Sequence, residues 1–203
     1  MIKAVLFDFG GVLSEAGARG TVRNWLGKVY GLDLDVQKAE DVFYRMWRGQ
    51  ISDDDFLAEM SRRYPEVPVV TKADFMKHMQ QFHRCRPVYA LAEQLRAYGI
   101  KTGILSNVFG MGAEPLRAGG FYDDFDPVVL SSDTGLAKPD PAFYQLAMSK
   151  LGCAPQEILF IDDQQYALDP AVAMGMYTIL AISPEQIVTD TKKLIKAQNG
   201  LNL

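Results

Sequence analysis

The apolar residues of the chain fall into short continuous runs that alternate with helical stripes. The first run, over 2–7, meets Asp8 and two glycines, which is typical of a buried parallel strand ending in a turn. Similar runs, bounded by turn-forming residues, follow at 99–105, 127–130, 157–161 and 177–181. We therefore expect five strands along the chain.

Amphipathic stretches between these runs predict helices. Val88, Leu91 and Leu95 share one helical face just before the second strand. Asp140 precedes Pro141 as a natural N-cap, and Gly152 closes the helix that follows. Alternating strands and helices predict an α/β fold, with a Rossmann-like parallel sheet flanked by helices on both sides.

Residues from about 15 to 83 break this alternation, because they carry helical stripes without a strand-like run. The stripes begin at Val22, at Val42, after Ser52 and at Phe75. The pattern predicts an α-helical cap inserted after the first strand. The expected division is a core domain over 1–14 and 84–203 and a helical cap domain over 15–83.

Charge and composition narrow the class of protein. The formal net charge is −4, and 48% of residues are hydrophobic, as in globular proteins. This acidity argues against nucleic acid or an anionic membrane as partner, and no apolar run is long enough to span a bilayer. Two cysteines cannot build a disulfide framework. We expect a cytoplasmic protein, either a monomer or a homodimer.

Polar residues follow the predicted strands where each strand ends. They are Asp8, Ser106 with Asn107, Lys138, and Asp162 with Asp163. The carboxyl ends of parallel strands converge on the crevice where ligands bind in open α/β sheets. Carboxylates gathered there need a cation, and their oxygens suit Mg²⁺. The set indicates metal-assisted phosphoryl transfer with Asp8 as nucleophile.

Four motifs contain these residues. In chain order they are Phe7-Asp8-Phe9-Gly10-Gly11-Val12-Leu13, Leu105-Ser106-Asn107, Gly135-Leu136-Ala137-Lys138-Pro139-Asp140-Pro141 and Phe160-Ile161-Asp162-Asp163. Their order and spacing resemble those of the haloacid dehalogenase-like (HAD) hydrolase superfamily, and the similarity covers essentially the whole chain. The insertion resembles the helical cap of that family, and the chain resembles its sugar-1-phosphate phosphatase-like branch.

The resemblance implies a role for each residue. Asp8 would form an aspartyl-phosphate, and Ser106 would bind the phosphoryl group with Asn107 beside it. Lys138 would neutralise the nucleophile and the phosphate. Mg²⁺ would be bound by the carboxylates of Asp8 and Asp163 and by the backbone carbonyl of Gly10. Asp162 would not contact the metal but would orient water or Lys138. The implied function is a Mg²⁺-dependent phosphatase of a small phosphorylated metabolite, with sugar phosphates among the candidates.

Gly10 departs from the family's usual pattern, in which a second aspartate two residues after the nucleophile serves as general acid and base. Such help contributes about 10²–10⁴-fold in rate. Its absence is compatible with a slow enzyme, or with a substrate whose leaving group needs little protonation.

Two alternatives stay open at this point. A 2-haloacid dehalogenase uses the same nucleophile without a metal and also lacks the second aspartate, but its fourth motif lacks the Asp162-Asp163 pair. A non-catalytic HAD-fold binding protein is favoured only by Gly10. Arg45 and Arg48, three apart on a predicted cap helix, offer positive charge to an anionic substrate or form a solvated face.

Overall fold

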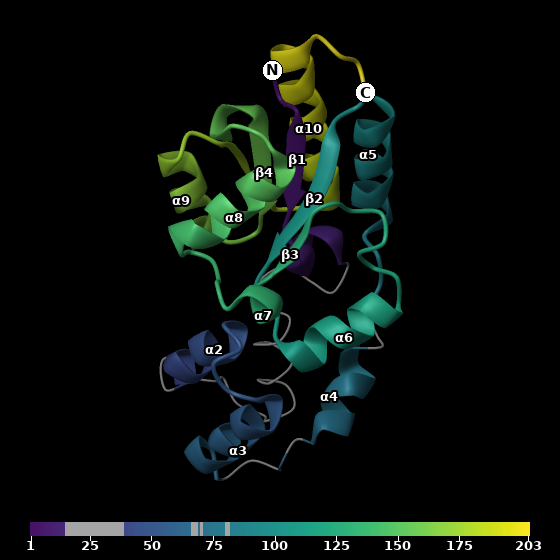
Figure 1. The fold of residues 1–203 in the computed structure, drawn as a ribbon. Helices are drawn as coiled ribbons and strands as arrows, with labels where there is room; N and C mark the ends of the chain where they lie inside the picture. The colour runs from purple at the N-terminus through teal and green to yellow at the C-terminus, as the bar shows by residue number, and fades with distance from the viewer. Residues whose placement is uncertain (15–38, 66–68, 70, 80–81) are drawn as a thin grey trace.

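The fold is taken from a computed structural model, which describes residues 1–14, 39–65, 69, 71–79 and 82–203 (Figure 1). A five-stranded sheet has the order β3-β2-β1-β4-β5, and every neighbouring pair is parallel. The predicted α/β class and all five predicted strands are confirmed. The strands are β1 (Ala4–Phe7), β2 (Lys101–Ser106), β3 (Val128–Leu130), β4 (Ile158–Asp162) and β5 (Tyr177–Leu180).

The central strand β1 sets the position of the polar residues. Phe7 lies opposite Ile104 of β2 on one side and Ile161 of β4 on the other. The backbone N–H of Asp8 continues the ladder, since it donates to the carbonyl of Ile161 over 2.9 Å. The residues that follow these strands therefore emerge together at one edge of the sheet.

Alternating side chains bury both faces of the sheet. Val5 and Phe7 belong to the apolar cluster of one face, whereas Ala4 and Leu6 belong to that of the other. Figure 1 shows a pair of helices on each side. These helices are α5 (Arg86–Ala97) and α10 (Pro184–Asn199) on the first face, and α8 (Pro141–Leu151) and α9 (Gln165–Ala173) on the second.

The predicted ends of α8 are confirmed. The side chain of Asp140 accepts a hydrogen bond from the backbone N–H of Ala142 over 3.0 Å. Gly152 ends the helix with a φ of +63°, which favours glycine. A single 3₁₀ turn, Pro155–Glu157, then leads into β4.

Between β1 and α5, the described residues form three α-helices, as expected from the stripes that begin at Val42, after Ser52 and at Phe75. Figure 1 shows them beyond the sheet edge at which β1 ends, past two further helices of the sheet domain. The stripe that begins at Val22 lies outside the described residues. The inserted helices are α2 (Glu40–Trp47), α3 (Asp53–Arg63) and α4 (Lys72–Met79), and the two further helices are α6 (Gly110–Ala118) and α7 (Ser131–Thr134).

The chain returns to the sheet beside the point where it left. Ser14 and Arg84 form an isolated antiparallel bridge, and the N–H of Cys85 donates to the carbonyl of Leu13 over 2.8 Å. This pairing closes the base of the insertion. Within the described ranges, no helix combines the length and apolar character needed to cross a membrane.

Candidate active site

The predicted polar residues meet at the carboxyl end of the sheet. Asp8 follows β1, Ser106 ends β2 and Asp162 ends β4, while Lys138 comes from the loop before α8. All four are buried, and so is Asp163. Carboxylate oxygens of the three aspartates lie within 4.8 Å of one another.

Lys138 bridges two of the carboxylates. Its Nζ lies 2.8 Å from Oδ1 of Asp8 and 2.6 Å from Oδ2 of Asp162. Burial lowers the pKa of Lys138, but the negative charges of Asp162 and Asp8 raise it by more, so the ammonium keeps its proton. Burial raises the pKa of Asp162, and Asp8 adds to this rise, whereas Lys138 opposes it.

The two adjacent aspartates at the end of β4, Asp162 in the strand and Asp163 directly after it, face different surroundings. Both carboxylate oxygens of Asp162 are engaged inside the protein, Oδ2 by Lys138 and Oδ1 by the backbone N–H of Gln164 at 2.8 Å. Asp163 instead lines a cavity together with Asp8, and its Oδ2 accepts from Nε2 of Gln164 at 2.8 Å. Asp163 is therefore placed to meet a ligand, and Asp162 is placed to hold Lys138.

The side-chain amide of Asn107 forms two hydrogen bonds with the backbone of Lys138. Its Oδ1 accepts from the N–H of Lys138 at 2.8 Å, and its Nδ2 donates to the carbonyl of Lys138 at 3.0 Å. Asn107 lines the same cavity, but its amide is used to position Lys138. Ser106 also lines the cavity, and its hydroxyl forms no hydrogen bond within the part of the chain that the structure describes.

Two glycines follow the candidate nucleophile and differ in conformation. Gly11 has a φ of +74°, in the region that favours glycine, and a Cβ there would lie 2.8 Å from Oδ2 of Asp163. Gly10 has a φ of −70°, which any residue adopts, and it lines the cavity. The backbone conformation therefore favours glycine at position 11, whereas the φ at position 10 sets no such restriction.

The donor set fits a hard divalent cation. Three buried carboxylates gather here, and among the described residues the ammonium of Lys138 lies against two of them, those of Asp8 and Asp162. Such a cluster repels itself unless a cation offsets it, and oxygen ligands suit Mg²⁺. Asp8 and Asp163 are the two carboxylates of the cluster that line the cavity.

The cavity that opens above these groups has a volume of about 530 Å³. Its lining also includes residues that the sequence did not indicate as site residues. They come from α2, from the segments before α5 and α6, and from the first turn of α9. Two of them lie close in sequence to predicted site residues, because Phe109 follows Asn107 by two residues and Tyr166 follows Asp163 by three. The residues are Glu40, Phe43, Tyr44, Trp47, Phe82, Phe109 and Tyr166.

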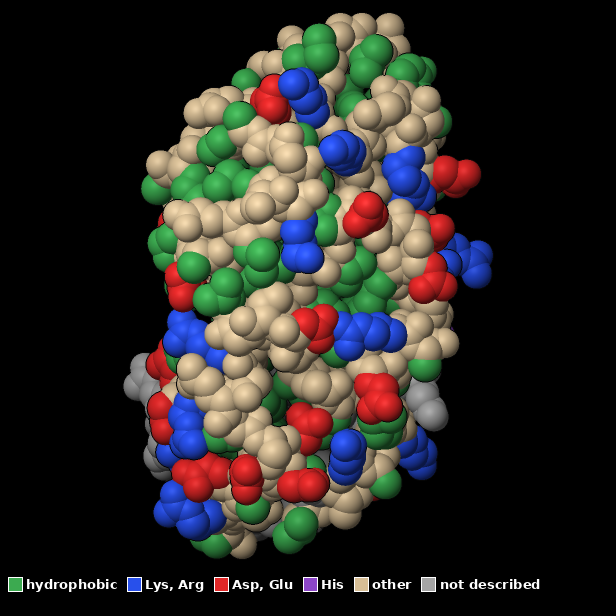
Figure 2. All heavy atoms as spheres, in the orientation of Figure 1, with side chains coloured by type: hydrophobic (Ala, Val, Ile, Leu, Met, Phe, Trp, Pro, Cys, Tyr) green, Lys and Arg blue, Asp and Glu red, His purple; other side chains and the backbone are tan. Residues whose placement is uncertain are grey.

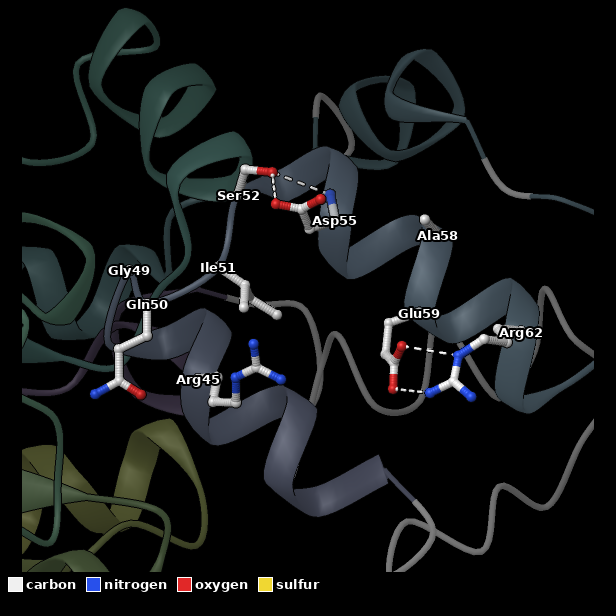
Figure 3. Close-up of a pocket in the computed structure, with 9 residues that line it drawn as sticks. All are labelled: Arg45, Gly49, Gln50, Ile51, Ser52, Asp55, Ala58, Glu59 and Arg62. Atoms are coloured by element: carbon white, nitrogen blue, oxygen red, sulfur yellow. Dashed lines mark hydrogen bonds and ion pairs between the residues drawn. The ribbon is translucent and has the colours of Figure 1, made fainter.

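Arg45 of α2 and Arg48, which directly follows this helix, do not line this cavity. Arg45 points into a separate hollow of about 510 Å³ between α2 and α3, where Arg62 pairs with Glu59 (Figure 3). The Arg48 guanidinium lies 5.9 Å from the ring centroid of Tyr44. Neither arginine is therefore positioned among the predicted site residues.

Known proteins similar to this chain include enzymes named as phosphatases. The mouse protein named acyl-CoA dehydrogenase family member 10 is 30% identical over 95% of this chain, which spans 19% of that protein. Glyceraldehyde 3-phosphate phosphatase of Methanocaldococcus jannaschii is 25% identical, over 88% of this chain and 84% of the relative.

A solved structure with the same fold is that of a HAD family enzyme from Bacteroides thetaiotaomicron, in complex with magnesium and inorganic phosphate. It has a TM-score of 0.69 at 20% identity and covers 88% of this chain and 93% of its own. The model of the haloacid dehalogenase-like hydrolases matches residues 2–175, which is most of the chain. The chain belongs to the haloacid dehalogenase-like hydrolase family.

Proposed function

We propose that the chain is a Mg²⁺-dependent phosphatase that hydrolyses the monoester of a small phosphorylated metabolite through an aspartyl-phosphate on Asp8. The observation that carries this proposal is the placement of Asp8: its carboxylate lines the cavity and lies 2.8 Å from the ammonium of Lys138. A carboxylate held beside a buried cation is suited to attack an anionic phosphate, because the cation offsets their repulsion.

Each residue then has a distinct part. A carboxylate oxygen of Asp8 attacks phosphorus, the bond to the leaving oxygen breaks, and the electron pair departs with that oxygen. The hydroxyl of Ser106 donates to a phosphoryl oxygen. Asn107 and Asp162 act through Lys138, one by holding its backbone and the other by holding its ammonium. Water then attacks phosphorus and restores Asp8.

Asp8, Asp163 and the backbone carbonyl of Gly10 would bind the metal. Bound there, Mg²⁺ supplies positive charge that neutralises the phosphate oxygens. Gln164 supports this arrangement, because its amide fixes the carboxylate of Asp163.

The inserted helices would serve as a cap over the site. Residues of α2 line the same cavity as Asp8, so this helix contributes to the space in which a substrate would lie. Closure of such a cap excludes water that would otherwise hydrolyse the acyl-phosphate early. The names of the M. jannaschii relative and of the magnesium and phosphate complex support the same reaction class.

Hydrolysis of p-nitrophenyl phosphate by the purified chain, with and without Mg²⁺, tests the proposal. We expect turnover that requires Mg²⁺ and is lost in Asp8→Asn, which keeps the shape of the side chain but removes its charge. Arg45→Ala is the matched control, because Arg45 lies outside the cavity. Absence of turnover at every Mg²⁺ concentration, in a folded protein, would favour a binding protein instead.

A further inference from the structure

Away from the reacting groups, the cavity is lined largely by aromatic rings. Helix α2 contributes Phe43, Tyr44 and Trp47, and Phe82 and Phe109 come from the segments before α5 and α6. Aromatic faces and edges bind flat apolar groups by offset stacking and edge-to-face contact. The described lining therefore favours a substrate with a flat apolar part beyond its phosphate.

These rings hold one another in place. The ring of Trp47 lies 6.0 Å from that of Phe43 and 5.7 Å from that of Tyr44, measured between centroids. Phe43 in turn packs edge-to-face on the buried Phe56 of α3 at 5.4 Å. We call the rings of Phe43, Tyr44 and Trp47 the aromatic wall of the cavity. Because these rings are already held in place, a ligand binds to this wall without the entropy cost of ordering loose side chains.

The same wall offers little to a second anionic group. Among the described residues that line the cavity, the charged side chain outside the reaction centre is Glu40, an acid. Arg45 faces the separate hollow (Figure 3). The charge of Arg48 lies over the ring of Tyr44. Figure 2 shows that acids and bases are interspersed on the surface over α2 and α3, without a basic patch on that face.

Gly10 gives an independent constraint on the same substrate. No carboxyl group stands two residues after Asp8, so the leaving oxygen departs without a proton from that position. Departure is then fastest when the leaving oxygen is a weak base, because negative charge builds on it in the transition state. A phenolic oxygen meets this requirement and is attached to a flat ring.

We propose that the substrate is a monophosphate whose ester oxygen is attached to a flat apolar group, an aryl phosphate in its simplest form. This inference rests on the proposed phosphatase function and names its substrate class. The phosphorus–oxygen bond to the aryl group breaks as Asp8 bonds to phosphorus, and the aryl oxygen leaves with the electron pair and takes a proton from water. A second water releases inorganic phosphate from Asp8.

The first test separates recognition of the ring from acidity of the leaving group. Phenyl phosphate is compared with hexafluoroisopropyl phosphate, whose alcohol is of similar acidity but has no ring, and with glucose 1-phosphate. We expect kcat/KM for phenyl phosphate to exceed both by about tenfold or more. Equal or faster turnover of the fluoroalkyl ester or the sugar ester would overturn the proposal.

The second test measures binding in Asp8→Asn, which does not turn over. Calorimetry with Mg²⁺ present should show phenyl phosphate binding at least about tenfold more tightly than inorganic phosphate, because the ring adds contacts with the wall. Trp47→Leu in the same background should remove most of this difference and leave inorganic phosphate unchanged. Arg45→Leu, on the same helix but outside the cavity, should change neither.

An incorrect substrate class and an incorrect phosphatase function would give different experimental results. If Asp8-dependent hydrolysis of p-nitrophenyl phosphate occurs but phenyl phosphate and inorganic phosphate bind Asp8→Asn equally, the substrate class is wrong and the phosphatase function stands. If no phosphate ester is hydrolysed at all, the proposed function itself is wrong. The binding comparison needs no change in the wall, so it remains decisive even if Trp47→Leu does not fold.

Discussion

A Cβ placed on Gly11 would stand 2.8 Å from Oδ2 of Asp163 and 2.9 Å from its Cγ, closer than side chains approach one another. The loop after β1 thus brings bare backbone against a carboxylate from the loop after β4. The carboxylate of Asp163 can occupy this place because Gly11 has no side chain.

Gly11→Ala should therefore displace Asp163 and raise the Mg²⁺ concentration needed for half-maximal activity, by about tenfold or more. It should also cost about 1–3 kcal/mol of stability, because the φ of +74° strains an alanine. Gly99→Ala is the matched control: its φ is +77°, but nothing lies within 4 Å of the added Cβ. Equal Mg²⁺ requirements in the two variants would show that Gly11 does not position the metal ligand.

Asp163→Asn and Asp162→Asn should separate metal binding from lysine positioning. Asp163→Asn should abolish the rise in melting temperature that Mg²⁺ gives the wild type, and without metal it should melt no lower, because a repulsive charge is removed. Asp162→Asn should retain the Mg²⁺-induced rise but lose about 3 kcal/mol, since Lys138 loses a buried partner 2.6 Å away. Thermal unfolding with and without Mg²⁺ measures both effects. If Asp162→Asn abolished the Mg²⁺-induced rise and Asp163→Asn retained it, the proposed roles of the two aspartates would be wrong.

Asn107→Ala should lower kcat without changing the Mg²⁺ requirement. The substitution leaves the N–H and the carbonyl of Lys138 without their side-chain partner, at a cost of about 1–3 kcal/mol. Asn107→Asp, which keeps the acceptor for the N–H, should retain more activity than Asn107→Ala. If both variants instead weaken phosphate binding with kcat unchanged, Asn107 contacts the phosphate directly.

The sheet and the convergence of its polar residues were predictable because the signals are local. Strands buried on both faces read as continuous apolar runs, and a polar residue after each run must lie at the same edge. Asp8, Ser106, Asp162 and Asp163 are therefore found together, although their metal and phosphate roles remain predictions.

The pairing of Asn107 with Lys138 was not predictable, because the two residues lie on separate loops and no local pattern links them. The position of Phe43 and Trp47 in the cavity lining was not predictable either. Helical spacing identifies a face that is kept from solvent, but not whether it meets another helix or a cavity. The need for glycine at position 11 likewise depends on Asp163, whereas two adjacent glycines alone indicate only a turn.

Gly10→Asp should help poor leaving groups selectively. The φ of −70° accepts a side chain, and position 10 lines the cavity, so a carboxyl group there is placed to donate a proton to the leaving oxygen. The gain for an alkyl phosphate should approach about 10²-fold, with little gain for p-nitrophenyl phosphate. A leaving-group series compares the slopes of log rate against leaving-group pKa. Parallel slopes in two folded, Mg²⁺-binding proteins would mean that another group in the cavity supplies the proton.

The proposed reaction requires Asp8 to carry the phosphoryl group during turnover. The enzyme is quenched while it hydrolyses p-nitrophenyl phosphate with Mg²⁺ and is then reduced with borohydride, which converts an acyl-phosphate of aspartate to homoserine. Peptide mass spectrometry should find homoserine at position 8, and only when substrate and Mg²⁺ were both present. Unmodified aspartate at position 8 in enzyme quenched during rapid turnover, or homoserine at another aspartate, would contradict the account.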